Sequence, residues 1–287
     1  MKISEYPSVS ELATDNVFII DGSNGTKKIA ASDLRYALFN SLPSMHRKIY
    51  RGKNLGSTFT TKQKTAVQEG TFDDLWLGDY WTIGAYDYII ADMDYFYKEG
   101  ETHNVNALQS HHLLMIPRNS MGKSKYISNG SGNTYGYAGS LARSNLTSIR
   151  STITNAFGSN VLTFKMPIIK NITSGWVQTI QYYDCQAELL TEAMCFGGVF
   201  ESQMFGNDRA SQNMSDFNAR QLALFDCDPS FIKLSSTDPN TTSGIYWLQD
   251  PASNNGFCIV TGNGRPGATS VSSTGSEMGL RPFFLIG

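Results

Sequence analysis

Alternating runs of apolar and polar residues predict a small, strand-rich module at the start of the chain. The run NVFIIDG (16–22) predicts a strand, SNG a turn, and TKKIA a second strand that returns beside the first. The following SDLRYALFNSLP has helical spacing, with Ser32 or Asp33 suited to cap the helix and Pro43 expected to end it. Residues 1–43 are therefore predicted to form a β-β-α module. Such a module buries little surface alone, so we expect it to need a partner surface.

The next segment, residues 44–70, is polar and carries scattered lysine and threonine residues. This pattern predicts a linker followed by a short helix in TTKQKTAVQEG, at the entry of the main domain. Beyond it, aromatic and apolar residues become dense, and residues 71–287 are expected to form a head domain.

Strand periodicity marks both ends of the head domain. DYWTI and YDYIIADMDYF have the alternation of strands and are joined by a Gly-Ala turn. The final residues, GLRPFFLIG, predict a buried strand. If the first and last strands pair, the two ends of the domain meet in one sheet. The middle of the chain is then free to form long loops.

A helix is predicted between these ends, in SLARSNLTSIRSTITNAFG. Gly158 follows its last turn and suits the C-terminal cap. Its apolar residues recur at helical spacing and form one stripe, which consists of Ala142, Leu146, Ile149, Ile153 and Phe157.

Composition narrows the functional classes. The 287 residues are 40% hydrophobic and 17% charged, with a net charge of −2. A nucleic-acid-binding surface usually shows a basic excess, which is missing here, so no nucleic-acid partner is expected. No apolar run reaches the ~20 residues of a membrane span, and the N-terminus lacks the apolar region of a secretory signal. We therefore expect no membrane insertion.

The reactive residue types form no catalytic or metal-binding pattern. The four cysteines include no Cys-x-x-Cys pair and are expected to be buried, reduced thiols. The aspartates of residues 73–94 alternate with aromatics, unlike a calcium loop. His111 and His112 are adjacent on a predicted strand, so they should point to opposite faces. The sequence thus predicts no enzyme activity, no metal and no cofactor.

The N-terminal segment resembles a known class of sequences. ISEYPSVSELATDNVFIIDGSNGTKKIAASDL is similar to the start of many bacteriophage tail-fibre, baseplate and head-fibre proteins. These share Ile-Ser-Glu-Leu-Pro, a short apolar strand, a Gly turn and Thr-Lys-Lys-Ile. Tyr6 stands here in place of the usual Leu. The resemblance implies that residues 1–43 attach the chain to other virion proteins.

The C-terminal segment resembles a C-type-lectin-like domain of phage and bacterial proteins. That domain carries W-W-L-R-S-P and a final G-V-R-P strand, and this chain has YWLQDP and GLRP. Gln249 and Asp250 replace Arg-Ser, so any role of that arginine is missing. The resemblance implies an α+β fold: the small β-β-α module, then a C-type-lectin-like head with paired N- and C-terminal strands. The calcium-binding triplets of sugar-binding C-type lectins do not occur. Formylglycine-generating enzymes share the fold but use two cysteines near the C-terminus, where this chain has only Cys258.

Two polar loops, at 127–140 and 250–277, are the candidate binding surface, because Tyr, Ser, Gly and Asn make adaptable contacts. Trp247 has an alternative interpretation as a core residue. The candidate ligand-binding residues are Tyr135, Tyr137, Trp247, Asp250, Asn254, Asn255 and Arg265.

The sequence leaves two functions open. The first is a tail or head fibre, expected as a homotrimer in the virion after assembly in the host bacterial cytoplasm, whose head binds a host-surface glycan or protein. The alternative is a purely structural baseplate, collar or capsid-decorating component without receptor binding.

Overall fold

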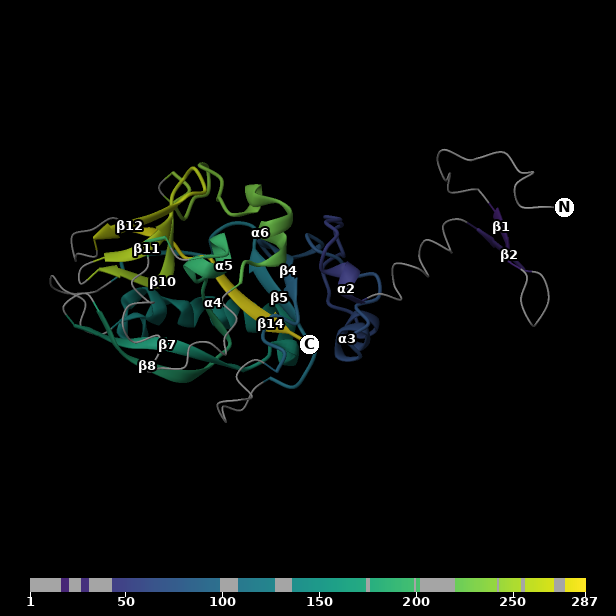
Figure 1. Cartoon of the computed structure of the whole chain (residues 1–287), viewed down its shortest axis with the longest axis horizontal. Helices are drawn as coiled ribbons and strands as arrows, with labels where there is room; N and C mark the ends of the chain where they lie inside the picture. Colours follow the sequence, from purple (N-terminus) through teal and green to yellow (C-terminus); the bar gives the residue numbers. More distant parts are fainter. Residues whose placement is uncertain are drawn as a thin grey trace.

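The structure is a computed structural model. It describes residues 17–20, 27–30, 43–98, 108–126, 136–173, 176–198, 200–201, 220–241, 243–253, 256–270 and 277–287. Within these ranges the chain is a mixed α+β protein, built mainly from sheets with few helices (Figure 1). The predicted α+β class is therefore confirmed.

The N-terminal hairpin forms as the sequence pattern predicted. β1 (Val17–Ile20) and β2 (Lys27–Ala30) pair antiparallel, with Val17 opposite Ala30. Most of the helix predicted after them lies outside the described residues. Pro43, expected to end that helix, instead begins the short helix α2 (Pro43–His46). Proline suits the first helical position, because its missing N–H has no partner there and its φ is already helical.

The larger sheet has the strand order β3-β4-β5-β14-β9, and all its neighbours pair antiparallel. Its strands are β3 (Tyr80–Ile83), β4 (Tyr86–Met93), β5 (Leu113–Pro117), β9 (Ala187–Leu189) and β14 (Pro282–Ile286). The predicted hairpin through Gly84 and Ala85 is confirmed. The first and last strands of the domain do share a sheet, but they do not pair, because β4 and β5 lie between them.

The final strand is buried in the core, as the apolar run in GLRPFFLIG predicts. All residues of β14 are buried, and the strand pairs with β5 on one side and β9 on the other. Phe284 lies edge-on to the Tyr88 ring at 5.6 Å, while Phe283 contacts Phe164 at 5.5 Å. A strand that is apolar on both faces gains most from an interior position, since each face can then be covered.

The predicted long helix forms as α4 (Leu141–Phe157) and buries the stripe expected from its sequence. Ser140 caps its start by accepting a hydrogen bond from the Arg143 N–H, at 3.1 Å. Gly158 ends it with φ 60°, a conformation that costs glycine little. Phe157 at its last turn packs on Phe284 of the large sheet, at 5.5 Å between rings.

The smaller sheet has the order β12-β11-β10-β13-β6. Its strands are β6 (Lys123–Ser124), β10 (Tyr246–Ser253), β11 (Gly256–Val260), β12 (Pro266–Ser270) and β13 (Met278–Gly279). A separate antiparallel hairpin consists of β7 (Phe164–Thr173) and β8 (Trp176–Cys185). The remaining helical turns are α3 (Thr61–Gln68), η3 (Tyr137–Gly139), η4 (Gly158–Asn160), α5 (Glu192–Phe196), α6 (Ala223–Cys227) and η7 (Pro229–Phe231).

The segment predicted as a linker is part of the head. Residues 45–56 lie along the outer edge of β3, with parallel bridges from Tyr50 to Leu77 and from Asn54 to Tyr80. The expected short helix follows as α3, which begins with a capping box at Thr60 and Gln63. The polar composition of this segment misled the linker prediction, because its charged residues pair with buried aspartates of the head.

Candidate functional site

Most of the predicted loop 250–277 is strand, because it contains the end of β10 and all of β11 and β12. In the predicted loop 127–140, residues 137–139 form the helical turn η3. Short segments of both predicted loops start at one end of the small sheet. Gly256 pairs with both Ser253 and Ser270, so the segments 254–255 and 271–276 begin at the same end. Tyr126, which precedes residue 127, stacks on the Phe257 ring at 3.7 Å between centroids. Strands β10–β12 lie at the opposite end of the head from α2 and α3 (Figure 1). The tertiary structure thus gathers the starts of three separate polar segments.

Tyr126 joins Trp247 and Phe257 in an aromatic cluster on the small sheet. Trp247 lies edge-on to Tyr126 at 4.9 Å, and its Nε1–H donates to the Ser124 carbonyl at 2.8 Å. Only 2% of its surface is exposed. Trp247 is therefore a core residue, and its assignment as a ligand contact is corrected in favour of the alternative. The indole packs its large apolar area inside while its one donor finds a buried acceptor.

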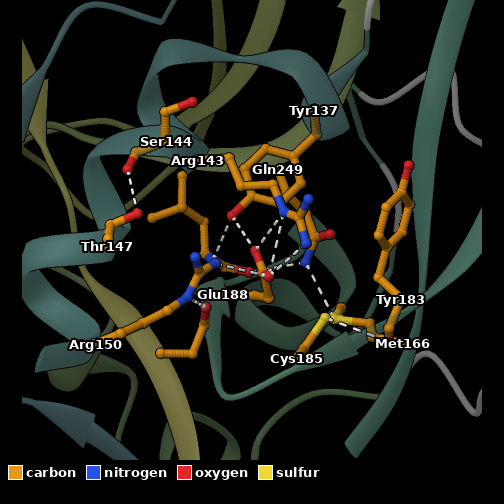
Figure 2. A network of polar contacts seen from close by, with 12 residues as sticks. Tyr137, Arg143, Ser144, Thr147, Arg150, Met166, Tyr183, Cys185, Glu188 and Gln249 are labelled. Carbon is orange, nitrogen blue, oxygen red and sulfur yellow. Dashed lines mark hydrogen bonds and ion pairs between the residues drawn. The ribbon is translucent and has the colours of Figure 1, made fainter. Parts of the chain in front are cut away.

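Tyr137 is also buried, and it belongs to a cluster of polar side chains around Glu188 (Figure 2). Its hydroxyl donates to the Glu188 carboxylate at 2.8 Å and accepts the Leu189 N–H at 3.0 Å. Burial, together with the charge of Glu188, raises the pKa of Tyr137 well above its ordinary value. The phenol therefore stays a neutral donor that anchors the chain directly after residues 127–135, and it is not the exposed contact expected from the sequence.

Two arginines of α4 complete the Glu188 cluster. Arg143 donates from Nε and Nη2 to the carboxylate, the latter at 2.9 Å, and Arg150 donates from Nη2 at 3.0 Å. Arg143 also lies over the Tyr183 ring, 4.7 Å from its centroid. The two arginines stand seven residues apart on one side of a helix, which is the one sequence signal that could have pointed to a shared acidic partner.

Asp250 is the third predicted contact that the structure buries. Its Oδ2 accepts the backbone N–H of Glu192, the first residue of α5. Burial raises the pKa of Asp250 to about 7, and the nearby Glu192 charge adds to the effect. The Glu192 carboxylate in turn accepts the N–H groups of Phe200 and Glu201, at 3.0 and 2.9 Å. Asp250 thus holds α5 against β10 and does not face solvent.

The remaining predicted contacts separate into two groups. Tyr135, Asn254 and Asn255 lie outside the described residues. Arg265 is exposed, as expected, in a turn that the Thr261 side chain closes by accepting the Arg265 N–H at 3.1 Å. Of the predicted contacts that the structure describes, Arg265 alone is available to a ligand.

Arg281 of the GLRP segment has a structural role that the sequence did not disclose. Its guanidinium is buried and donates to the carbonyls of Pro117 (3.0 Å), Phe231 (2.7 Å) and Ile232 (3.2 Å). It also lies 5.6 Å from the Tyr246 ring centroid. Arg281 therefore ties the start of β14 to β5, to η7 and to the small sheet through one side chain.

The thiols and imidazoles show no assembled catalytic arrangement among the described residues. Cys185, Cys195 and Cys258 are buried, and burial raises the pKa of each thiol, whereas Cys227 is exposed, which corrects its expected burial. His112 is buried and His111 is partly exposed beside Asp94, with Nδ1 2.8 Å from its carboxylate. Across the described ranges, no three His, Cys, Asp or Glu side chains lie close enough to hold a metal ion. No helix in the described part of the chain has the length and apolarity to cross a membrane.

Comparison with protein-family models, with curated proteins and with solved structures found no match for this chain.

Proposed function

We propose that this chain is a non-enzymatic component of a bacteriophage virion, in which residues 1–43 bind other virion proteins and the head binds a host-surface glycan or protein. The observation that carries the binding proposal is that three segments rich in Gly, Ser or Asn start at one end of the small sheet. The virion assignment is supported by the resemblance of the N-terminal segment to phage fibre and baseplate proteins.

We also propose that the head is C-type-lectin-like. A buried terminal strand in the interior of the main sheet and a smaller loop-bearing sheet are compatible with that fold. The three backbone hydrogen bonds of Arg281 supply a physical reason for an arginine in the GLRP segment. A buried arginine whose donors face carbonyls of separate segments makes the position of the last strand specific.

The chemistry of the converging segments favours a polar, uncharged ligand. Asn, Ser and Tyr side chains supply hydrogen bonds and flat apolar contact while few long side chains are immobilised. Buried contacts hold the chain on both sides of residues 127–135: Tyr126 packs on Trp247, and the Tyr137 hydroxyl donates to Glu188. Because no cluster of charge drives recognition, binding should vary little between low and high salt.

A purely structural virion component is the second candidate. It is favoured by the burial of Tyr137, Trp247 and Asp250, which leaves fewer exposed aromatic contacts than the sequence predicted. In that case the same end of the sheet would pack on a neighbouring virion protein. We propose a homotrimer in both cases, which light scattering of the full-length chain tests directly.

The two candidates are distinguished by a binding experiment. Fluorescently labelled full-length protein is applied to a glycan array and to a panel of bacterial strains. We expect retention on selected glycans or strains, with loss of retention in the Tyr135→Ala, Arg265→Ala double variant. A matched control is Lys170→Ala, which changes an exposed residue of β7. Unchanged retention in the double variant, or retention nowhere while antibodies locate the protein inside the assembled particle, would contradict receptor binding and support the structural role.

A further inference from the structure

The connection between the N-terminal module and the head is a strap, formed by residues 45–56. Backbone hydrogen bonds hold it along β3: the Leu55 N–H donates to the Tyr80 carbonyl at 2.7 Å, and the Tyr80 N–H donates to the Lys53 carbonyl at 3.0 Å. The Arg51 N–H donates to the Leu77 carbonyl at 2.9 Å. The strap is thus an extra parallel strand segment at the edge of the large sheet.

Ion pairs fasten the strap to buried carboxylates. Arg51 donates to both oxygens of Asp79, which is fully buried and also accepts the Lys53 N–H at 2.9 Å. Arg47 pairs with Asp92, a second fully buried carboxylate. Removal of the strap would leave both carboxylates without these partners, so the docked state is strongly preferred while the partners stay in place.

His46 lies at the start of the strap and is fully buried. Its Nδ1 lies 2.7 Å from the Leu75 carbonyl, which requires a proton on that nitrogen. Its Nε2 is buried and has no hydrogen-bond partner among the described residues. The ring stacks on Trp76, with centroids 4.1 Å apart and an interplanar angle of 23°. The docked strap therefore accommodates the neutral imidazole, because a second N–H at Nε2 would have no acceptor.

The charges around His46 do not reverse this preference. Asp73 and Asp79 favour the imidazolium, Arg51 disfavours it, and the stacked indole face attracts a cation. Burial outweighs the favourable contributions, so the pKa of docked His46 lies below its ordinary value of 6.5. The released strap binds a proton more readily than the docked strap, and docking must weaken as pH falls below 6.5.

We propose that the strap is an acid-sensitive connection, in which protonation of His46 weakens the docking of residues 45–56 at the edge of the large sheet and raises the released fraction. Release would leave the head joined to residues 1–43 through an undocked segment, without unfolding the head itself. This inference does not depend on the proposed virion function, since it rests on the contacts of the strap alone.

Hydrogen exchange of the full-length protein, followed by mass spectrometry, tests the proposal. Exchange rates are corrected for the intrinsic pH dependence of amide exchange. We expect the protection of strap amides to fall by up to about tenfold for each pH unit below 6.5, as one linked proton requires. The amides of β5 and β14 in the same sample report on the head and should keep their protection.

Variants separate His46 from other titrating groups. In His46→Asn the side-chain amide has an N–H that can replace the Nδ1–H donor to the Leu75 carbonyl, but it does not titrate, so strap protection should lose its pH dependence. His111→Asn, which removes a partly exposed histidine, should behave as the wild type. Strap protection that is independent of pH in the wild type, or equally pH-dependent in His46→Asn, would overturn the proposal. So would parallel loss of β5 and β14 protection, which would indicate general loosening through buried His112.

A second measurement is independent of any variant. The His46 ring resonance of the wild-type protein, followed by NMR, should titrate with a pKa below 6.5. A pKa at or above that value would contradict the burial argument and the proposal with it.

Discussion

Replacing Glu188 by Gln tests whether the buried polar cluster stabilises the loop-bearing end of the head. The substitution keeps the size of the side chain but removes the charge that faces Arg143 and Arg150. It also leaves one oxygen to accept hydrogen bonds where two accept them now, from both arginines and from Tyr137. The perturbation is therefore electrostatic, with little change in packing.

The expected loss of unfolding free energy follows from the burial of Glu188 and the partial burial of Arg143 and Arg150. Breaking a buried ion pair by removing one partner costs about 3–5 kcal/mol. The side chains of Arg143 and Arg150 are 16% and 26% exposed, so water can partly solvate them once the carboxylate is gone. We therefore expect the lower end, about 3 kcal/mol, which lowers Tm by about 6–12 °C in a domain of this size.

Urea unfolding followed by circular dichroism measures this difference, with the midpoint and slope compared between variants. The matched control is Asp184→Asn, because Asp184 also pairs with a cation, Lys165 at 2.8 Å, but its side chain is 64% exposed. An exposed pair of this kind contributes about 0–1 kcal/mol. If Glu188→Gln costs less than about 1 kcal/mol, or no more than the control, the buried cluster does not stabilise the head.

Three further predictions concern other parts of the chain. Truncation before Arg281 should abolish the folded head. The four apolar residues of β14 after Pro282 contribute about 1.5–3 kcal/mol each, against a total stability of about 5–15 kcal/mol. A truncated protein with an unchanged Tm would refute this. Deletion of residues 1–42 should leave the Tm of the head nearly unchanged but prevent incorporation into particles, which mass spectrometry of purified virions measures. Deletion of residues 1–58 should also lower the Tm, because it removes the strap. Equal Tm values for the two deletions would contradict the docked strap. Asp250→Asn should remove one contribution to the pH dependence of stability, because burial raises the pKa of Asp250 from 3.8 to about 7. The stability of the wild type relative to the variant should therefore fall as pH rises through this window, by at most about 1.4 kcal/mol per pH unit. A stability difference that stays constant with pH in urea unfolding would refute this.

The candidate site was predictable only in outline. The polar segments were visible as Gly-, Ser- and Asn-rich stretches, and the exposure of Arg265 agrees with that pattern. The roles of Tyr137, Trp247 and Asp250 were not, because a tyrosine, a tryptophan or an aspartate beside a loop has the same sequence context whether it is exposed or buried. Their burial depends on partners such as Glu188 and Ser124, which lie 51 and 123 residues away from Tyr137 and Trp247 in the chain.

By itself, the sequence determined the elements whose burial pattern is local. The apolar stripe of α4, the hairpin of β3 and β4 and the apolar run of β14 each follow from periodicity within a few turns or residues. The tertiary structure alone decided which strands became neighbours, so that β14 lies between β5 and β9 and not beside β3. It also decided that the polar strap docks on the head, through pairs such as Arg47 with Asp92, 45 residues apart. The physical reason is that a charged side chain is more stable in water than in the core unless a partner of opposite charge lies beside it. The sequence around either residue does not show where in the chain that partner is.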